Sequence, residues 1–127
     1  MTRVFDASAV LVAIFEEAGG NRVVALWSAG ENLLSAVNYA EVVSKLAERG
    51  MSAAEITAVI EGVPLTVTAF DQPTAHAAGL LRPVTKALGL SLGDRACLAL
   101  GQVRNARVIT AERIWKKVKG VEIEVIR

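Results

Sequence analysis

The sequence has few of the residues on which many active sites depend. Its 127 residues include one cysteine and one histidine. The single cysteine, Cys97, excludes an internal disulfide and fits a reducing compartment, so we expect a cytoplasmic protein. The single histidine, His76, falls within a predicted helix and has no obvious serine or cysteine partner. We therefore do not expect a nucleophilic triad.

Long apolar runs and the common phosphate-binding motifs are also absent. No run reaches the roughly 18 apolar residues of a membrane span, and residues 1–15 lack the basic start and small-residue cleavage site of a signal peptide. There is no G-x-x-x-x-G-K-[ST] sequence, and no G-x-G-x-x-G sequence follows the first predicted strand. The sequence therefore predicts neither a membrane protein, a P-loop NTPase nor a dinucleotide-binding domain.

Aliphatic residues dominate what is present. Hydrophobic residues make up 53% of the chain, which is enough for a substantial core and argues against disorder. The formal net charge is only +1, so a nucleic-acid ligand would require a local basic patch. No repeat, linker or low-complexity tract divides the chain, and we expect one domain over residues 1–127.

Short apolar strands alternate with helices along the whole sequence. This order is typical of βαβ crossovers and predicts an α/β fold with a mainly parallel sheet covered on both faces. The expected strands cover residues 2–5, 32–36, 65–70, 107–110 and 121–126, the last as an edge strand. The expected helices cover residues 7–17, 22–28 (with Asn21 as N-cap), 37–49, 52–61, 72–88 (kinked or split at Pro83) and 111–119, with one more beginning after Ser91.

The helix after Ser91 runs apolar beyond its first turn and carries an acid in that turn. Ser91 is a suitable N-cap, and Ala96 to Leu100 make the helix apolar on nearly every face, so we expect it to be buried. Asp94 at the third helical position has two interpretations. It caps the helix, or it belongs to a site at the edge of the sheet.

Three further acids follow strands in the same way. Asp6 ends the first strand, Glu41 lies one helical turn beyond the second, and Glu112 comes two residues after the strand that ends at Thr110. In open α/β sheets, ligands bind outside the carboxyl ends of the strands. These three acids and Asp94 are therefore expected to converge at one edge of the sheet.

Such a set of carboxylates predicts a hard metal ion. Crowded carboxylates repel one another unless a cation is bound, and oxygen ligands without histidine or cysteine favour Mg²⁺ or Mn²⁺ over Zn²⁺. These ions support phosphodiester hydrolysis by activating water. Ser8 and Thr110 follow the same strands and either hydrogen-bond the carboxylates or serve as helix caps.

Four segments in order resemble the PIN-domain ribonucleases, specifically the toxins of VapBC-type toxin–antitoxin pairs. They are Val4–Ala9, Asn38–Val42, Leu90–Leu100 and Val108–Trp115. The family's fourth acid is usually aspartate, whereas this chain has Glu112. The resemblance implies a three-layer α/β/α fold with about five strands, a homodimer, and inhibition by a cognate antitoxin.

The resemblance also implies an activity and a site. The expected activity is a Mg²⁺- or Mn²⁺-dependent endoribonuclease, with an RNA substrate. Asp6, Glu41 and Asp94 would hold the metal, and Glu112 would support them or a second ion.

Basic and aromatic side chains near these acids have competing interpretations. Arg113, Lys116 and Lys117 either hold RNA phosphates or form a solvated face, and Arg95 contacts phosphate or, as we favour, pairs with an acid. For Trp27 and Trp115, packing is favoured over stacking on a base.

A protein partner and two rival functions are also compatible with the sequence. The helices that carry Glu41 and Glu55 have apolar stripes, which either form a groove for an antitoxin helix or pack on the sheet. A non-catalytic PIN-like binding module and another Mg²⁺-dependent phosphoryl-transfer domain are the alternatives to a ribonuclease.

Overall fold

The computed structural model describes residues 1–127 and contains a five-stranded, entirely parallel sheet. The strand order is β3-β2-β1-β4-β5, so β1 is central and pairs with both β2 and β4. The chain builds outward on one side from β1 to β3 and then returns to the other side of β1. The bounds are β1 (Thr2–Phe5), β2 (Glu31–Ser35), β3 (Thr66–Thr68), β4 (Arg107–Thr110) and β5 (Ile123–Val125).

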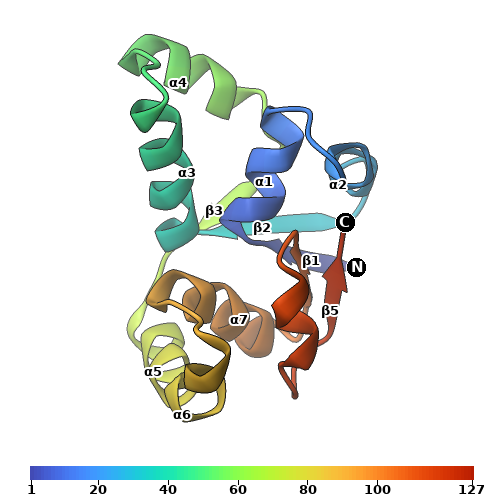
Figure 1. Ribbon diagram of the computed structural model, residues 1–127, viewed down its shortest axis with the longest axis vertical. Coiled ribbons are helices and arrows are strands. Elements are labelled where there is room, and N and C mark those ends of the chain that lie inside the picture. The colour runs from blue at the N-terminus through green and yellow to red at the C-terminus, as the bar shows by residue number, and fades with distance from the viewer.

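Helices cover both faces of this sheet, as Figure 1 shows, and the predicted three-layer α/β/α fold is confirmed. One face carries α1 (Ala7–Ile14), α2 (Gly20–Leu26), α3 (Ala36–Glu48) and α4 (Ala53–Glu61). The other face carries α5 (Gln72–Leu80), α6 (Arg82–Thr85), the 3₁₀ turn η1 (Lys86–Leu88) and α7 (Leu92–Arg104). None of the helices has the length and hydrophobicity that crossing a bilayer requires.

The alternation of side chains along each strand produces two separate cores. Val4 and Val108 point into the core under α5 and α7, whereas their neighbours Phe5 and Ile109 point into the core under α1, α2 and α3. This alternation is the ordinary consequence of the pleat. Buried aliphatic side chains on both faces fix the register, because a slip of one residue would exchange the two cores.

Helix α7 is the buried helix that the sequence predicts. Seven of its residues are buried, and Gly101 allows close approach to β4, because a Cβ there would lie 2.5 Å from a methyl group of Val108. Ser91 is the N-cap, and its hydroxyl accepts a hydrogen bond from the Asp94 N–H at 3.2 Å. The apolar faces of α7 therefore hold the first turn of the helix, with Asp94, at the carboxyl edge of the sheet.

The split predicted at Pro83 is confirmed: the helix expected over 72–88 is divided into α5, α6 and η1, because Pro83 cannot continue the backbone hydrogen-bonding pattern. Other predicted boundaries are wrong. The basic helix predicted over 111–119 is only a 3₁₀ turn, η2 (Arg113–Lys117). The first helix stops at Ile14 instead of Glu17.

The second helix also begins earlier than expected. Gly19, not Asn21, precedes its first turn, with a φ of 92°. A Cβ at Gly19 would collide with Ile126, so this tight entry is possible only for glycine.

Candidate functional site

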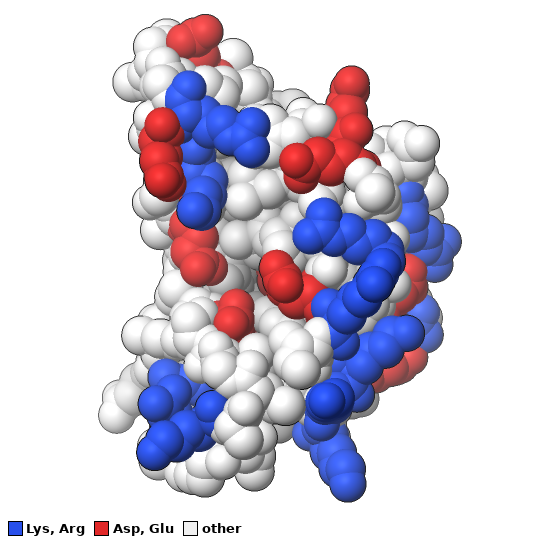
Figure 2. Space-filling model, viewed as in Figure 1, with Lys and Arg blue, Asp and Glu red and all other residues white.

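The four predicted acids line one pocket at the carboxyl edge of the sheet. The pocket has a volume of about 260 Å³, and its wall includes Asp6, Glu41, Asp94 and Glu112. Asp6 directly follows β1 and Glu112 follows β4, so the pocket lies where the strand order reverses. Figure 2 shows acidic side chains in the middle of this face, with Lys and Arg side chains on both sides.

Asp6 is the most deeply buried of these acids, with 3% of its surface exposed. It is the N-cap of α1 and accepts a hydrogen bond from the Ala9 N–H at 2.8 Å. The Ser8 hydroxyl lies 2.8 Å from both carboxylate oxygens, and the Thr110 hydroxyl donates to Oδ2 at 2.7 Å. Burial outweighs these hydrogen bonds and raises the pKa of Asp6 to about 7.

Ser8 and Thr110 do more than contact Asp6. The Ser8 Oγ accepts a hydrogen bond from the Ala111 N–H at 3.0 Å, and the Thr110 Oγ1 accepts one from the Glu112 N–H at 3.0 Å. Ser8 is not the N-cap of its helix, because Asp6 occupies that role. The two hydroxyls join the start of α1 to the chain after β4, and so fix Asp6 relative to the backbone of Glu112.

Glu41 is held by two residues that sequence reasoning did not single out. The Asn38 side-chain amide donates to Glu41 Oε1 at 2.7 Å and to the Gly93 carbonyl at 3.0 Å. A Cβ on Gly93 would lie only 2.6–2.8 Å from the Glu41 carboxylate, so that carboxylate occupies space that only glycine leaves open. We call Asn38 and Gly93 the Glu41 seat. The i, i+3 spacing of Asn38 and Glu41 was the signal available in the sequence.

Asp94 combines the two interpretations that the sequence left open. Its Oδ2 accepts a hydrogen bond from the Ser91 N–H at 2.9 Å, which completes a capping box, and its side chain also lines the acid pocket. Glu112 is exposed and lines the same pocket. The acids thus differ in restraint: Asp6, Glu41 and Asp94 each have fixed hydrogen-bond partners, whereas no side-chain hydrogen bond holds Glu112.

The donor set suits a hard cation, although the side chains are not drawn together around one. No three of the His, Cys, Asp and Glu side chains are close enough to hold a metal ion between them. The pocket nevertheless offers only oxygen ligands from its four acids, which is the chemistry that Mg²⁺ and Mn²⁺ prefer. The Oδ1 of Asn38 is also buried there without a hydrogen-bond partner.

The cysteine and the histidine of the chain lie outside the pocket wall. Cys97 is fully buried, and its pKa is raised well above its usual value, first by burial and then by the charges of Asp6, Asp94 and Glu41. It therefore stays a neutral thiol. His76 is exposed on α5.

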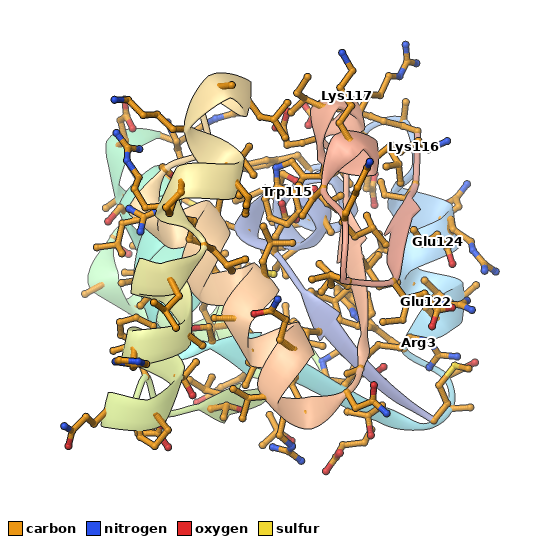
Figure 3. All side chains as sticks on the ribbon, turned by 90° about the horizontal axis from the view of Figure 1, so that it is seen from below. Arg3, Trp115, Lys116, Lys117, Glu122 and Glu124 are labelled. Carbon is orange, nitrogen blue, oxygen red and sulfur yellow. The ribbon has the colours of Figure 1, made fainter.

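The predicted RNA-binding cations do not line the acid pocket. Arg95 donates to the Ala78 carbonyl at 3.1 Å and ties α7 to α5, so the expected pairing with an acid is wrong. Arg113, Lys116 and Lys117 are exposed on η2, and Figure 3 shows Lys116 and Lys117 on the outside of this turn. The cation that does line the pocket is Lys45, which sequence reasoning missed.

Both tryptophans pack against the core, as favoured from the sequence, Trp115 fully buried and Trp27 half-buried. Trp115 is 1% exposed and contributes to the core under α7. In Figure 3 it points inward beneath η2. Trp27 packs edge-on against Phe5, with the ring centroids 6.2 Å apart.

Comparison with known proteins gives one family and a consistent set of folds. The sequence pattern of the PIN domain matches residues 3–121. The chain is similar to one in the crystal structure of VapBC2 from Rickettsia felis bound to promoter DNA, with a TM-score of 0.80, 16% identity and full coverage of both chains. A second similar structure is DNA-bound VapBC from Salmonella typhimurium, with a TM-score of 0.79, 20% identity and coverage of 100% and 99%.

A third similar structure is described as a toxin that cleaves the sarcin–ricin loop. It is VapC20 from Mycobacterium tuberculosis, with a TM-score of 0.74, 13% identity and coverage of 96% of this chain and 98% of that one. Comparison with curated proteins finds no matching sequence. At these identities the structural similarity concerns the fold.

Proposed function

Because this chain belongs to the PIN-domain family, we propose that it is a Mg²⁺- or Mn²⁺-dependent endoribonuclease and the toxin of a toxin–antitoxin pair. One observation carries the proposal. Four acids from distant parts of the sequence, Asp6, Glu41, Asp94 and Glu112, line a single pocket at the point where the strand order reverses. The description of VapC20 as a toxin that cleaves the sarcin–ricin loop supports RNA as the substrate class.

In this proposal Asp6, Glu41 and Asp94 would hold the metal, and Glu112, which lines the same pocket, would support them or a second ion. A bound Mg²⁺ or Mn²⁺ supplies an activated water as nucleophile and stabilises the charge on the leaving oxygen. Ser8 and Thr110 orient the Asp6 carboxylate, and the Glu41 seat orients Glu41. The pKa of Asp6, raised to about 7, means that this carboxyl must lose a proton before it binds a cation.

A second hollow supports an antitoxin as partner. It lies between α3 and α4, has a volume of about 500 Å³, and is lined mainly by apolar side chains, among them Tyr39, Ile56 and Ile60. An amphipathic helix suits such a groove. Structures similar to this chain come from VapBC complexes, which supports a cognate antitoxin as the source of that helix. We propose further that the protein is a cytoplasmic homodimer.

Cleavage of total cellular RNA by the purified chain tests the proposal. With Mg²⁺ or Mn²⁺ we expect discrete fragments, and with EDTA no cleavage. The Asp94→Asn variant should be folded and inactive, because it keeps an oxygen for the helix cap but removes a charged ligand.

Two results would contradict the proposal. Full activity of Asp94→Asn would remove Asp94 from the site. A wild-type chain that binds Mn²⁺ and leaves every RNA of the sample intact, and whose expression without a partner does not arrest growth, would indicate a binding module.

A further inference from the structure

The acid pocket continues into an adjoining hollow along α1, which is distinct from the apolar groove between α3 and α4. This hollow also has a volume of about 260 Å³, and it shares Ser8, Leu11 and Lys45 with the acid pocket. Its remaining wall is formed by Val12, Phe15, Glu17, Arg49 and Arg127. The two hollows are therefore one groove that leaves the carboxyl edge of the sheet and runs between α1, α3 and the last residue of the chain. We call its outer part the basic groove.

Helix geometry places the cations of this groove in line with the acid site. Glu41, Lys45 and Arg49 are four residues apart, so they follow one face of α3 up to its C-cap. Successive members are separated by about 6 Å along the helix axis. The face thus begins with an acid at the pocket and continues with two cations that lead away from it.

The outer cations are held at the wall of the groove. The Arg49 guanidinium lies 4.0 Å above the centre of the Phe15 ring, which joins the end of α3 to the end of α1. On the opposite side, the Arg127 Nε donates to the Ala111 carbonyl at 3.3 Å. Lys45 keeps most of its side chain in solvent, with Glu48 at 3.5 Å as its ion-pair partner. The only acid on the wall of the basic groove is Glu17.

We propose that the basic groove binds the phosphates of a single RNA strand on one side of the bond that is cleaved. This inference rests on the proposed ribonuclease function. An acidic pocket alone repels a polyanion, so a strand needs cations close to the pocket to remain there. Lys45 is the first such cation, because it lines both hollows, and Arg49 and Arg127 follow. The cations on η2, which the sequence singled out, line neither hollow.

Binding of a short, fluorescently labelled single-stranded RNA in EDTA tests this assignment without cleavage. The variants are Lys45→Gln/Arg49→Gln in the basic groove, Arg113→Gln/Lys116→Gln/Lys117→Gln on η2, and Arg82→Gln/Lys86→Gln as a control with two exposed cations on α6 and η1. Arg49→Lys is added, because it keeps the charge if loss of the Phe15 contact disturbs the fold.

The groove variant should bind RNA at least tenfold more weakly than the wild type near 0.1 M salt. Its plot of log K against log salt concentration should be shallower by about 1.4, since each lost phosphate contact on a single strand removes about 0.7. The control should keep both the affinity and the slope, and Arg49→Lys should keep most of the slope. An unchanged slope in the groove variant, or loss of slope only in the η2 variant, would overturn the assignment.

Cleavage with Mn²⁺ separates this inference from the function on which it rests. If the wild type cleaves RNA and the groove variant cleaves it equally well at subsaturating RNA, the inference fails and the function stands. If the wild type does not cleave, the function fails, and the salt slopes still report whether the groove binds RNA. Unchanged RNA binding together with weaker binding of a polyglutamate peptide would assign the groove to an acidic protein segment instead.

Discussion

Asp6 combines deep burial with a role at the pocket. Its carboxyl group has a pKa of about 7 against an ordinary value of 3.8, mainly because burial disfavours the charged form. The folded state therefore binds a proton that the unfolded state releases between these two values. As a result, without a metal, the contribution of Asp6 to stability is present below about pH 4 and is lost as the pH rises through about 7.

Asp6→Asn should accordingly stabilise the metal-free protein at pH 8 but not at pH 4. The expected gain in the free energy of unfolding at pH 8 is about 1–3 kcal/mol, because the amide is neutral at every pH. Urea denaturation in EDTA at the two pH values measures it. A wild type that is as stable as the variant at pH 8 would show that the Asp6 carboxylate is well solvated or well paired.

The Glu41 seat gives a prediction in which activity and stability separate. Gly93→Ala places a methyl group where the Glu41 carboxylate lies, and the flexible end of Glu41 moves more easily than the backbone. We expect the cleavage rate to fall at least tenfold, whereas the melting temperature should change by only a few degrees. Asn38→Ala should have the same effect on the rate, since it removes the hydrogen bond to Glu41 Oε1.

Gly79→Ala is the matched control for this substitution. Gly79 lies within α5. Apart from its chain neighbours and the backbone of its own helix, no atom lies within 4 Å of a Cβ added there. Alanine there should stabilise the chain by about 0.5–1 kcal/mol and leave cleavage unchanged. Equal cleavage by the Gly93→Ala and Gly79→Ala variants would show that the position of Glu41 does not matter.

At the level of single residues, the sequence predicts those positions that the path of the backbone determines. The four acids could be expected at one edge because each follows a strand or begins a helix. The Gly93 part of the Glu41 seat could not, because it depends on how closely α7 approaches α3; only Asn38 has a local signal, its i, i+3 spacing from Glu41. Arg95 was misjudged for the same reason: its partner is the Ala78 carbonyl on α5, 17 residues away in the chain.

At the level of elements, α4 and α7 begin with the same capping motif, but only α7 begins at the acid pocket. Ser52 and Ser91 each begin a capping box, on α4 and α7 respectively. Alanine at either position should lower the free energy of unfolding by about 1 kcal/mol. Only Ser91→Ala should also lower the cleavage rate, because the Asp94 side chain shares that cap and lines the pocket.

Chemical denaturation and cleavage assays on both alanine variants check this prediction. If Ser52→Ala lowered cleavage as much as Ser91→Ala, the loss would reflect general destabilisation, and the cap of α7 would have no specific role at the site.

The element whose type the sequence did not predict depends on packing against distant parts of the chain. A strong cap and a continuous apolar face were sufficient to predict α7. The hydrophobic and basic pattern after Thr110 also suits a helix, but the chain there forms only the short turn η2 before it reaches β5. Packing of Trp115 and Val118 into the core, which no local pattern encodes, accompanies this tighter turn.

At the level of the whole molecule, the order of the strands creates the site. Because β1 is central and the chain crosses from β3 back to β4, Asp6 and Glu112 emerge from neighbouring strands, although they are far apart in the sequence. Helices α3 and α7 then bring Glu41 and Asp94 to the same edge. The basic groove results from the same arrangement, because α1 and α3 both begin at that edge and run away from it side by side (Figure 1).

Calorimetric titration of Mn²⁺ into the wild type and into Asp94→Asn at pH 7.5 is the most direct test that the four acids form one metal centre. Glu61→Gln, which removes an exposed acid from α4, is the control. The wild type and the control should bind the ion equally, and Asp94→Asn should bind it at least tenfold more weakly. A wild type that binds no Mn²⁺, or an Asp94→Asn variant that binds it with unchanged affinity, would contradict a metal centre at this pocket.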